Sequence, residues 1–369
     1  MTGKKKVIVG LSGGVDSSVA AYLLKQQGFD VTGVTMSIWD GKPNQVPSGK
    51  HACYGPDENE EIEEAKELAG ILEIPYRVFD CSQRYKTLVL DYFRQEYLSG
   101  RTPNPCVKCN QLIKFGMLPD AAKMEGLAFD YFATGHYAIV EWDDQRKRYL
   151  LKKGVDPRKD QTYFIYRLTQ QQLSKVLFPI GKMTKQEVRE IAAKINLPLS
   201  EKEESQDFYS GDYRDLLDLK DTPGDIVDHK GNVLGKHKGF WNFTIGQRKG
   251  LGVAYSEPLY VLSLNKETNT VVVGTREEVM SSSFIVNDLN WIAIESMSGP
   301  MEVDVKIRSA QNATGARIEH FEKDSVKVTF NLPNEGITPG QSAVFYQEDL
   351  VVGGGVIEEV VNLNSEIAK

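Results

Sequence analysis

Short apolar runs alternate with amphipathic segments through the first 200 residues of the chain. Four runs have the length and the β-branched or aromatic content of strands, at residues 6–10, 30–39, 75–81 and 130–134. Three intervening segments carry apolar residues at helical spacing, at residues 16–27, 57–73 and 83–98. Strands separated by helices predict an α/β fold with a doubly wound parallel sheet.

The end of this α/β part carries a specific helix signal. Thr184 and Glu187 have the spacing of a capping box, in which the two side chains satisfy backbone N–H groups at the helix start. The helix should end near Ile195, because Asn196 and Pro198 follow it. The α/β domain therefore extends at least through this helix.

The pattern changes after about residue 201, where glycines and turns become frequent. Short runs predict a hairpin and four further strands, at 261–264, 270–274, 303–307, 325–330, 342–346 and 350–357. We predict three domains: an α/β domain at 1–204, a small central β-rich domain at 205–280 and a C-terminal β-barrel at 281–369.

Composition narrows the class of protein. The chain has 369 residues, of which 41% are hydrophobic and 26% charged, an ordinary balance for a soluble protein. No run approaches the roughly 18 apolar residues of a membrane span, and the N-terminus lacks the apolar region of a signal peptide. We expect a cytoplasmic protein without membrane contact.

The net charge of −7 argues against a uniformly basic nucleic-acid binder. Basic residues nevertheless gather in two runs, at 146–161 and 230–249, while acids gather at 57–67. Such runs are more often an ordinary solvated surface, but they allow one basic face on an acidic protein.

The strongest chemical signal is VIVGLSGGVDSS, residues 7–18. A strand ends in Ser12-Gly13-Gly14, and Asp16 opens a helix, so backbone N–H groups gather at a positive helix end. Hydroxyl donors are added by Ser12, Ser17 and Ser18. The lysine of the Walker loop is missing, so the segment predicts a pyrophosphate cradle of another kind.

Two cysteines lie in a proline-rich segment, GRTPNPCVKCN, at residues 100–110. Proline disfavours helix at the preceding residue, so we predict a loop that presents Cys106 and Cys109 at the start of a helix from Gln111. The helix dipole there stabilises thiolate over thiol. In a reducing compartment, C-x-x-C indicates redox, sulfur or metal chemistry.

A third segment, ATGHYA at residues 133–138, follows the last predicted strand of the sheet. Doubly wound sheets bind ligands at the carboxyl ends of their strands, so this segment should face the same crevice as the glycine loop. His136 by itself is more typical of a core histidine than of a ligand contact.

These segments together resemble the tRNA-specific 2-thiouridylase family. The matching motifs are GLSGGVDSS, GRTPNPxxxCNxxIKFG, ATGHYA, KDQTYF at 159–164, TIGQRKGLGV at 244–253 and PGQSAVFY at 339–346. They occur in family order and cover nearly the whole chain. The resemblance implies an adenine nucleotide alpha hydrolase-like fold for the first domain. The glycine loop alone resembles that of all ATP pyrophosphatases, including argininosuccinate synthetase and GMP synthetase.

The resemblance implies roles for the matching residues. ATP would be held by Gly10, Leu11, Ser12, Gly13, Gly14, Val15, Asp16, Ser17, Met36 and Gly135. The target base would lie against Asn104, Pro105 and Cys106. Further tRNA contacts would come from His136, Lys159, Asp160, Gln161, Arg308 and Gln341. Cys109 matches the family's nucleophile, and Asp16 resembles the loop's acidic residue, a partner for Mg²⁺.

One departure from the family pattern concerns sulfur transfer. Many members carry a second catalytic cysteine in S-x-x-I-C-F, whereas the matching segment at 204–213 contains none. Position 106, aspartate in many relatives, is cysteine. In one hypothesis Cys109 carries a persulfide that Cys106 resolves. In the other, Cys53, Cys106 and Cys109 hold a 4Fe–4S cluster with one open iron, and Cys81 is the reserve ligand.

The predicted reaction is ATP-dependent 2-thiolation of the wobble uridine of tRNA. ATP would adenylate O2 of a uridine flipped out of the anticodon stack, and sulfur would replace AMP at C2. The sulfur donor would be a persulfide relay protein or sulfide. Two alternatives remain from the sequence: a ligase such as argininosuccinate synthetase, which needs no cysteine, and a non-catalytic RNA-binding module.

Overall fold

The structure, a computed structural model, describes residues 3–41, 52–198, 207–209, 211–322 and 324–361. They pack into two compact units. The first comprises the described residues of 1–90, 105–213 and 349–351, and the second those of 91–104, 214–348 and 352–369. None of the described helices combines the length and apolar composition that a membrane span requires. The predicted boundary at 204/205 falls outside the described residues and stays a prediction.

The first unit is built on a parallel sheet. Its strands are β1 (Lys6–Gly10), β2 (Asp30–Ser37), β4 (Tyr76–Asp80), β5 (Tyr131–Ala133) and β8 (Val176–Leu177). They lie in the order β4-β2-β1-β5-β8, and every neighbouring pair is parallel. The doubly wound fold is confirmed, and its strand order reverses between β1 and β5. Ligands bind at such a switch point, beyond the carboxyl ends of the strands.

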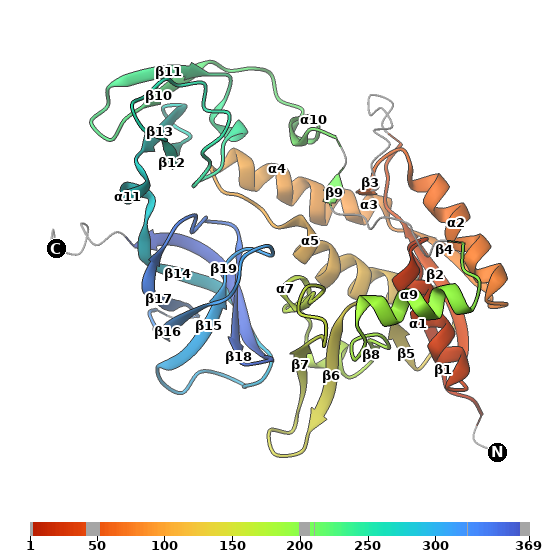
Figure 1. The fold of residues 1–369 in the computed structure, drawn as a ribbon. Helices are drawn as coiled ribbons and strands as arrows, with labels where there is room; N and C mark the ends of the chain where they lie inside the picture. The colour runs from red at the N-terminus through yellow and green to blue at the C-terminus, as the bar shows by residue number, and fades with distance from the viewer. Residues whose placement is uncertain (1–2, 42–51, 199–206, 210, 323, 362–369) are drawn as a thin grey trace. The chain divides into compact units, whose positions relative to one another are not determined.

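Helices cover both faces of this sheet (Figure 1). On one face, α1 (Val15–Gln26) and α2 (Glu58–Ile71) share an apolar core with β1, and α9 (Lys185–Lys194) packs on α1. On the other face, Phe132 of β5 meets Phe115 edge-to-face at 5.5 Å between ring centroids. The capping box of Thr184 and Glu187 at the start of α9 is confirmed.

The cysteine-bearing helix differs from the prediction. It begins at α5 (Pro105–Lys108) and continues through the π-helix η2 (Cys109–Met117) into α6 (Leu118–Met124), instead of starting at Gln111. Proline fits the first helical position because its missing N–H would be unpaired there. The predicted helix at 83–98 is likewise made of α3 (Ser82–Tyr85), the π-helix η1 (Lys86–Leu90) and α4 (Asp91–Leu98).

Several elements of the first unit were not predicted. The basic run at 146–161 contains half of an antiparallel hairpin, β6 (Ala138–Asp143) with β7 (Arg148–Lys153). Two short strands, β3 (Ala52–Tyr54) and β9 (Asp207–Tyr209), pair in parallel. The remaining short helices are α7 (Thr162–Ile165) and α8 (Gln170–Leu173). Cys53 lies in β3, whereas the sequence predicted a loop after the second strand.

The second unit contains a small sheet and a barrel. The sheet has the order β11 (Val233–His237), β10 (Gly224–Val227), β13 (Thr270–Gly274) and β12 (Tyr260–Asn265), so the predicted hairpin is confirmed. The short helix α10 (Tyr213–Leu217) precedes this sheet in the chain, η3 (Phe240–Asn242) lies between β11 and β12 in sequence, and α11 (Arg276–Val279) follows β13.

The barrel runs β14 (Ser281–Trp291), β17 (Val326–Asn334), β16 (Thr314–His320), β15 (Met301–Lys306), β18 (Ser342–Gln347) and β19 (Leu350–Val361). Pairing of β14 with β19 closes it and confirms the C-terminal barrel. Strands β14 and β16 were missed, because bulges in β14 and polar residues in both interrupt the alternation that predicts strands.

Candidate active site

The loop after β1 has the geometry of an anion cradle. Gly13 has φ +69°, in the left-handed region that favours glycine. A Cβ atom built there would stand 3.1 Å from the carbonyl oxygen of Glu61 and 3.1 Å from Glu64 Oε2. The loop leads straight into α1, whose first-turn N–H groups point out of the helix end.

The serine hydroxyls of this loop are used differently from the prediction. Ser17 Oγ and Ser18 Oγ donate to the Gly14 carbonyl at 3.1 and 3.0 Å. Ser18 is fully buried, so its hydroxyl fastens the loop to α1 instead of facing a ligand. Ser12 is exposed, and its backbone N–H donates to Ser17 Oγ at 3.3 Å.

Gly135, after β5, meets this loop at the switch point. A Cβ atom at Gly135 would lie 2.6 Å from the carbonyl carbon of Asp16 and 2.6 Å from the nitrogen of Ser17, so only glycine permits this approach. The two loops border a cavity of about 310 Å³. All ten residues expected at ATP line it: Gly10, Leu11, Ser12, Gly13, Gly14, Val15, Asp16, Ser17, Met36 and Gly135.

Lys185 also lines this cavity, although the sequence did not single it out. Its Nζ lies 2.8 and 2.9 Å from the two carboxylate oxygens of Asp16. Tyr137 donates its hydroxyl to Asp16 Oδ1 at 2.9 Å. Lys185 is 169 residues from Asp16 in sequence, so no local pattern could have indicated the pair.

Glu58, the first residue of α2, organises the end of β2 beside the cavity. Its side chain is buried, and its carboxylate accepts from Ser37 Oγ and the backbone N–H of Ile38, both at 2.6 Å, and from that of Trp39 at 3.0 Å. The segment that follows Met36 is thereby fixed at the cavity wall.

His136 is a buried residue that also lines the cavity. Its Nδ1 shares a 2.6 Å hydrogen bond with Thr134 Oγ1, and its ring packs against Phe115 and Phe178. Burial, aided by the nearby charge of Lys114, lowers the pKa of His136 well below its usual value. The neutral imidazole is therefore the form present at pH 7.

Cys109 does not have the lowered thiol pKa that we predicted for the start of a helix. Burial raises the pKa of Cys109 to about 12, despite the opposing charge of Lys114. Cys109 lies one turn inside the helix that starts at Pro105, so the helix end favours its thiolate less than expected. Cys106, in the first turn, is half-buried.

The other two cysteines differ in environment. Cys53 is exposed on β3 and lines the cavity. Cys81 is buried. Its burial, and to a smaller extent the negative charges of Asp80 and Glu58, raise the pKa of its thiol to about 11. Burial raises the pKa of Tyr85 as well, and Cys109, Cys53 and Cys106 add to this shift, so these three thiols lie within electrostatic range of one phenol. No three His, Cys, Asp or Glu side chains among the described residues are grouped to hold a metal ion.

The residues expected to contact tRNA have protein partners in the first unit. Gln161 lines the cavity and accepts the backbone N–H of Tyr137 at 3.0 Å. Asp160 accepts from the N–H of Thr162 at 3.2 Å at the start of α7. The backbone N–H of Lys159 donates to the Asp156 carbonyl at 3.0 Å. Their contacts to tRNA remain a prediction.

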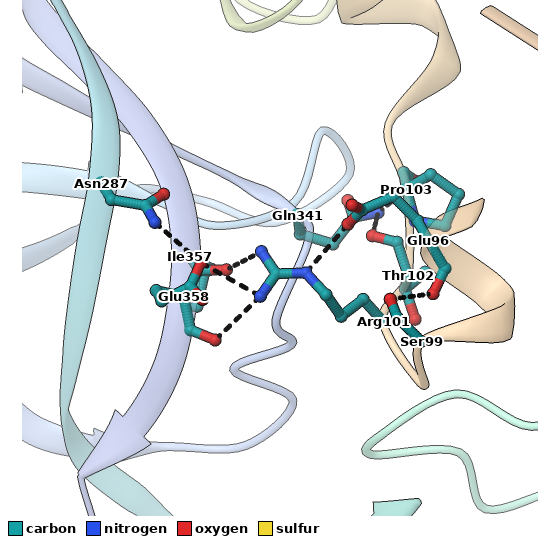
Figure 2. Close-up of polar contacts among 9 residues, drawn as sticks. All are labelled: Glu96, Ser99, Arg101, Thr102, Pro103, Asn287, Gln341, Ile357 and Glu358. Atoms are coloured by element: carbon teal, nitrogen blue, oxygen red, sulfur yellow. Dashed lines mark hydrogen bonds and ion pairs between the residues drawn. The ribbon is translucent and has the colours of Figure 1, made fainter. Parts of the chain in front are cut away.

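The second unit holds the loop that precedes the cysteines. Figure 2 shows Arg101 between Glu96 of α4 and Glu358 of β19, and Gln341 beside the loop. Gln341 donates its amide to the carbonyls of Thr102 and Pro103 at 3.1 and 2.8 Å. Asn104, the last residue of this loop, is buried. Arg308 donates to Thr338 Oγ1 at 3.0 Å.

Ion pairs occupy much of the two basic runs. These pairs include Arg146–Asp143, Lys147–Asp144, Lys152–Glu141, Lys236–Asp225 and Lys238–Asp221. Neighbouring carboxylates therefore reduce the positive potential that the sequence alone suggests for these runs.

Three protein-family models match the chain in succession. They are described as a tRNA methyl transferase HUP domain over residues 5–209, a tRNA methyl transferase PRC-barrel domain over 217–275 and an aminomethyltransferase beta-barrel domain over 281–357. The tRNA-specific 2-thiouridylase MnmA of Endomicrobium trichonymphae is 52% identical, covering 97% of this chain and 100% of that protein. That of Acetivibrio thermocellus is 45% identical, covering 96% and 99%.

Solved structures align only loosely. A 4-thiouridine synthetase–RNA complex with bound ATP is 17% identical, covers 55% of this chain and 44% of that one, and has a TM-score of 0.34.

Proposed function

The chain belongs to the tRNA-specific 2-thiouridylase family, and from this premise we propose that it uses ATP to replace O2 of the wobble uridine of tRNA with sulfur. One observation supports the use of ATP above all: the glycine loop and Gly135 border one cavity at the switch point of the sheet. Its α1 helix end and its two lysines, Lys114 and Lys185, suit a nucleotide phosphate chain.

The chemistry explains why ATP is needed. A carbonyl oxygen is a poor leaving group, and transfer of AMP to O2 with release of pyrophosphate turns it into a good one. Asp16 would hold Mg²⁺, which supplies charge neutralisation at the phosphates when bound. The target base would be flipped out of its stack, because its O2 is otherwise inaccessible. Asn104, Pro105 and Cys106 would lie against that base.

Sulfur transfer would use both thiols of the C-x-x-C. A donor, such as a persulfide relay protein, first leaves a persulfide on Cys109. The terminal sulfur of this persulfide forms a bond to C2 of the uridine as the bond from C2 to the AMP-bearing oxygen breaks. Cys106 then attacks Cys109 Sγ, which closes a disulfide and releases the thiouridine. An external dithiol returns two electrons to reduce the disulfide.

The helix geometry affects how easily Cys106 and Cys109 can form a disulfide. Side chains three residues apart on a helix have Cβ atoms about 5–6 Å apart, whereas a disulfide requires about 3.5–4.5 Å. The first turn at Pro105 would therefore open slightly as the disulfide closes, which makes the bond easy to reduce.

The 4Fe–4S alternative would use Cys53, Cys106 and Cys109. The three thiols lie within electrostatic range of Tyr85, yet no three His, Cys, Asp or Glu side chains among the described residues are grouped to hold a metal ion. This arrangement favours the persulfide version. Iron and sulfide analysis of anaerobically purified protein separates the two: stoichiometric iron that disappears in Cys53→Ala would reverse our choice.

The decisive experiment follows pyrophosphate and 2-thiouridine separately. Wild-type protein should release pyrophosphate from ATP only with tRNA present, and Cys109→Ser should keep pyrophosphate release but lose thiolation. A ligase of the argininosuccinate synthetase type would consume ATP without tRNA and would tolerate Cys109→Ser. A plain RNA-binding module would release no pyrophosphate at all. Either result would overturn the proposal.

A further inference from the structure

Lys185 occupies a position that is unfavourable for a lysine. It is the first residue of α9, at the positive end of that helix, where the dipole favours acids and disfavours cations. It is also only 7% exposed, and a buried ammonium is costly without a partner. Because both the helix start and the burial are unfavourable for an ammonium group, we expect a functional reason for this lysine.

The surroundings hold this lysine firmly. Its backbone N–H donates to Asp156 Oδ2 at 3.1 Å, and this bond lowers the pKa of the Asp156 carboxyl. Thr184, just before it, caps α9 through a complete capping box with Glu187. The side chain therefore projects from a fixed backbone into the cavity wall, where Nζ meets Asp16.

The charges around the cavity point to a role for this ammonium. The lining acids are Asp16, Glu58 and Glu61, and the lining cations are Lys114 and Lys185. Glu58 is already engaged with Ser37, Ile38 and Trp39. Asp16 thus neutralises Lys185 at the mouth of the glycine loop, which carries no lysine of its own.

We propose that Lys185 is a ligand for the phosphate chain of ATP and that Asp16 is its partner only while the cavity is free of nucleotide. On binding, the carboxylate of Asp16 turns to Mg²⁺, and the ammonium turns to a phosphate oxygen. Lys185 then supplies from α9 the charge that the Walker lysine supplies from within its loop. This inference rests on the proposed use of ATP.

The test measures binding of ATP and of adenosine, with Mg²⁺ and without tRNA, by calorimetry. The variants are Lys185→Met and Lys185→Gln, of which the second keeps a hydrogen bond to Asp16 and guards against loss of the fold. Lys182→Met, an exposed lysine three residues away, is the matched control. Loss of one charge-assisted bond should weaken ATP binding about 10- to 100-fold, and adenosine binding should stay within about twofold of wild type.

The outcomes separate three cases. ATP affinity within threefold of wild type in either folded variant overturns the role of Lys185 and leaves the proposed function standing. Equal losses for ATP and adenosine also overturn it, because they indicate a purely structural ion pair. If wild-type protein binds no ATP, the proposed function itself fails.

Discussion

Replacement of Arg101 by methionine should loosen the loop that leads into the cysteine helix. Arg101 Nε donates to Glu96 Oε2 at 2.9 Å, and Nη1 lies 3.1 Å from Glu358 Oε2. The same guanidinium donates to the carbonyls of Ile357 and Glu358 at 3.2 and 3.3 Å (Figure 2). Methionine keeps most of the side-chain volume and removes all four contacts.

The expected cost follows from burial. Loss of one partner from a fully buried ion pair costs about 3–5 kcal/mol, and from an exposed pair about 0–1 kcal/mol. Arg101 and Glu96 are 20% and 22% exposed, but Glu358 is 45% exposed and contributes little. We expect about 2–3 kcal/mol, and a fall in melting temperature of about 5–10 °C for a unit of this size.

The assay combines thermal unfolding with two activities. The loop at 99–104 continues directly into Pro105 and Cys106, so the thiolation rate should fall about tenfold. ATP affinity should not change, because the residues that line the ATP cavity all belong to the first unit. Arg317→Met is the control, since its pair with Glu302 is 3.8 Å long and its side chain is 55% exposed.

Equal melting temperatures for Arg101→Met and Arg317→Met would refute the energetic reasoning. A normal melting temperature with lost ATP affinity would contradict the separation of the loop from the cavity.

Three further predictions concern the loop, the thiols and the basic surface. Gly13→Val should weaken ATP binding at least 100-fold by calorimetry, because φ is +69° and the Cβ position is crowded, with tRNA affinity retained. Alkylation of Cys109 by iodoacetamide, followed by mass spectrometry, should be slow at pH 8 and should accelerate toward pH 12. At each pH it should be slower than alkylation of the exposed Cys53. An apparent pKa of Cys109 below 9 would contradict this. The double change Lys153→Ala/Lys159→Ala should reduce the salt slope of tRNA binding by about 1–2 in filter binding, and an unchanged slope would remove this segment from the interface.

The pH dependence of the thiol also affects stability. The pKa of Cys109 is raised in the folded state from an ordinary value near 9 to about 12. Below pH 9 the thiol is protonated in both the folded and the unfolded state, so its contribution to the free energy of unfolding is constant. Between pH 9 and 12 only the unfolded state loses it, and stability should fall with rising pH.

The sequence alone determined the features that depend on short-range geometry. Alternation of strands and helices gave the parallel sheet, and the spacing of Thr184 and Glu187 gave the start of α9. Gly13 was identifiable because a tight turn before a helix requires a left-handed residue. Each of these rests on hydrogen bonds and sterics within a few residues, which a local pattern records.

Tertiary structure alone decided which distant groups meet and what burial does to them. Lys185 reaches Asp16 across 169 residues, and Gln341 reaches Pro103 across 238. The thiol of Cys109 was expected to ionise easily at a helix start, yet its pKa is raised. The helix-end effect is local and small, whereas desolvation depends on every element packed around the thiol, which no local pattern records.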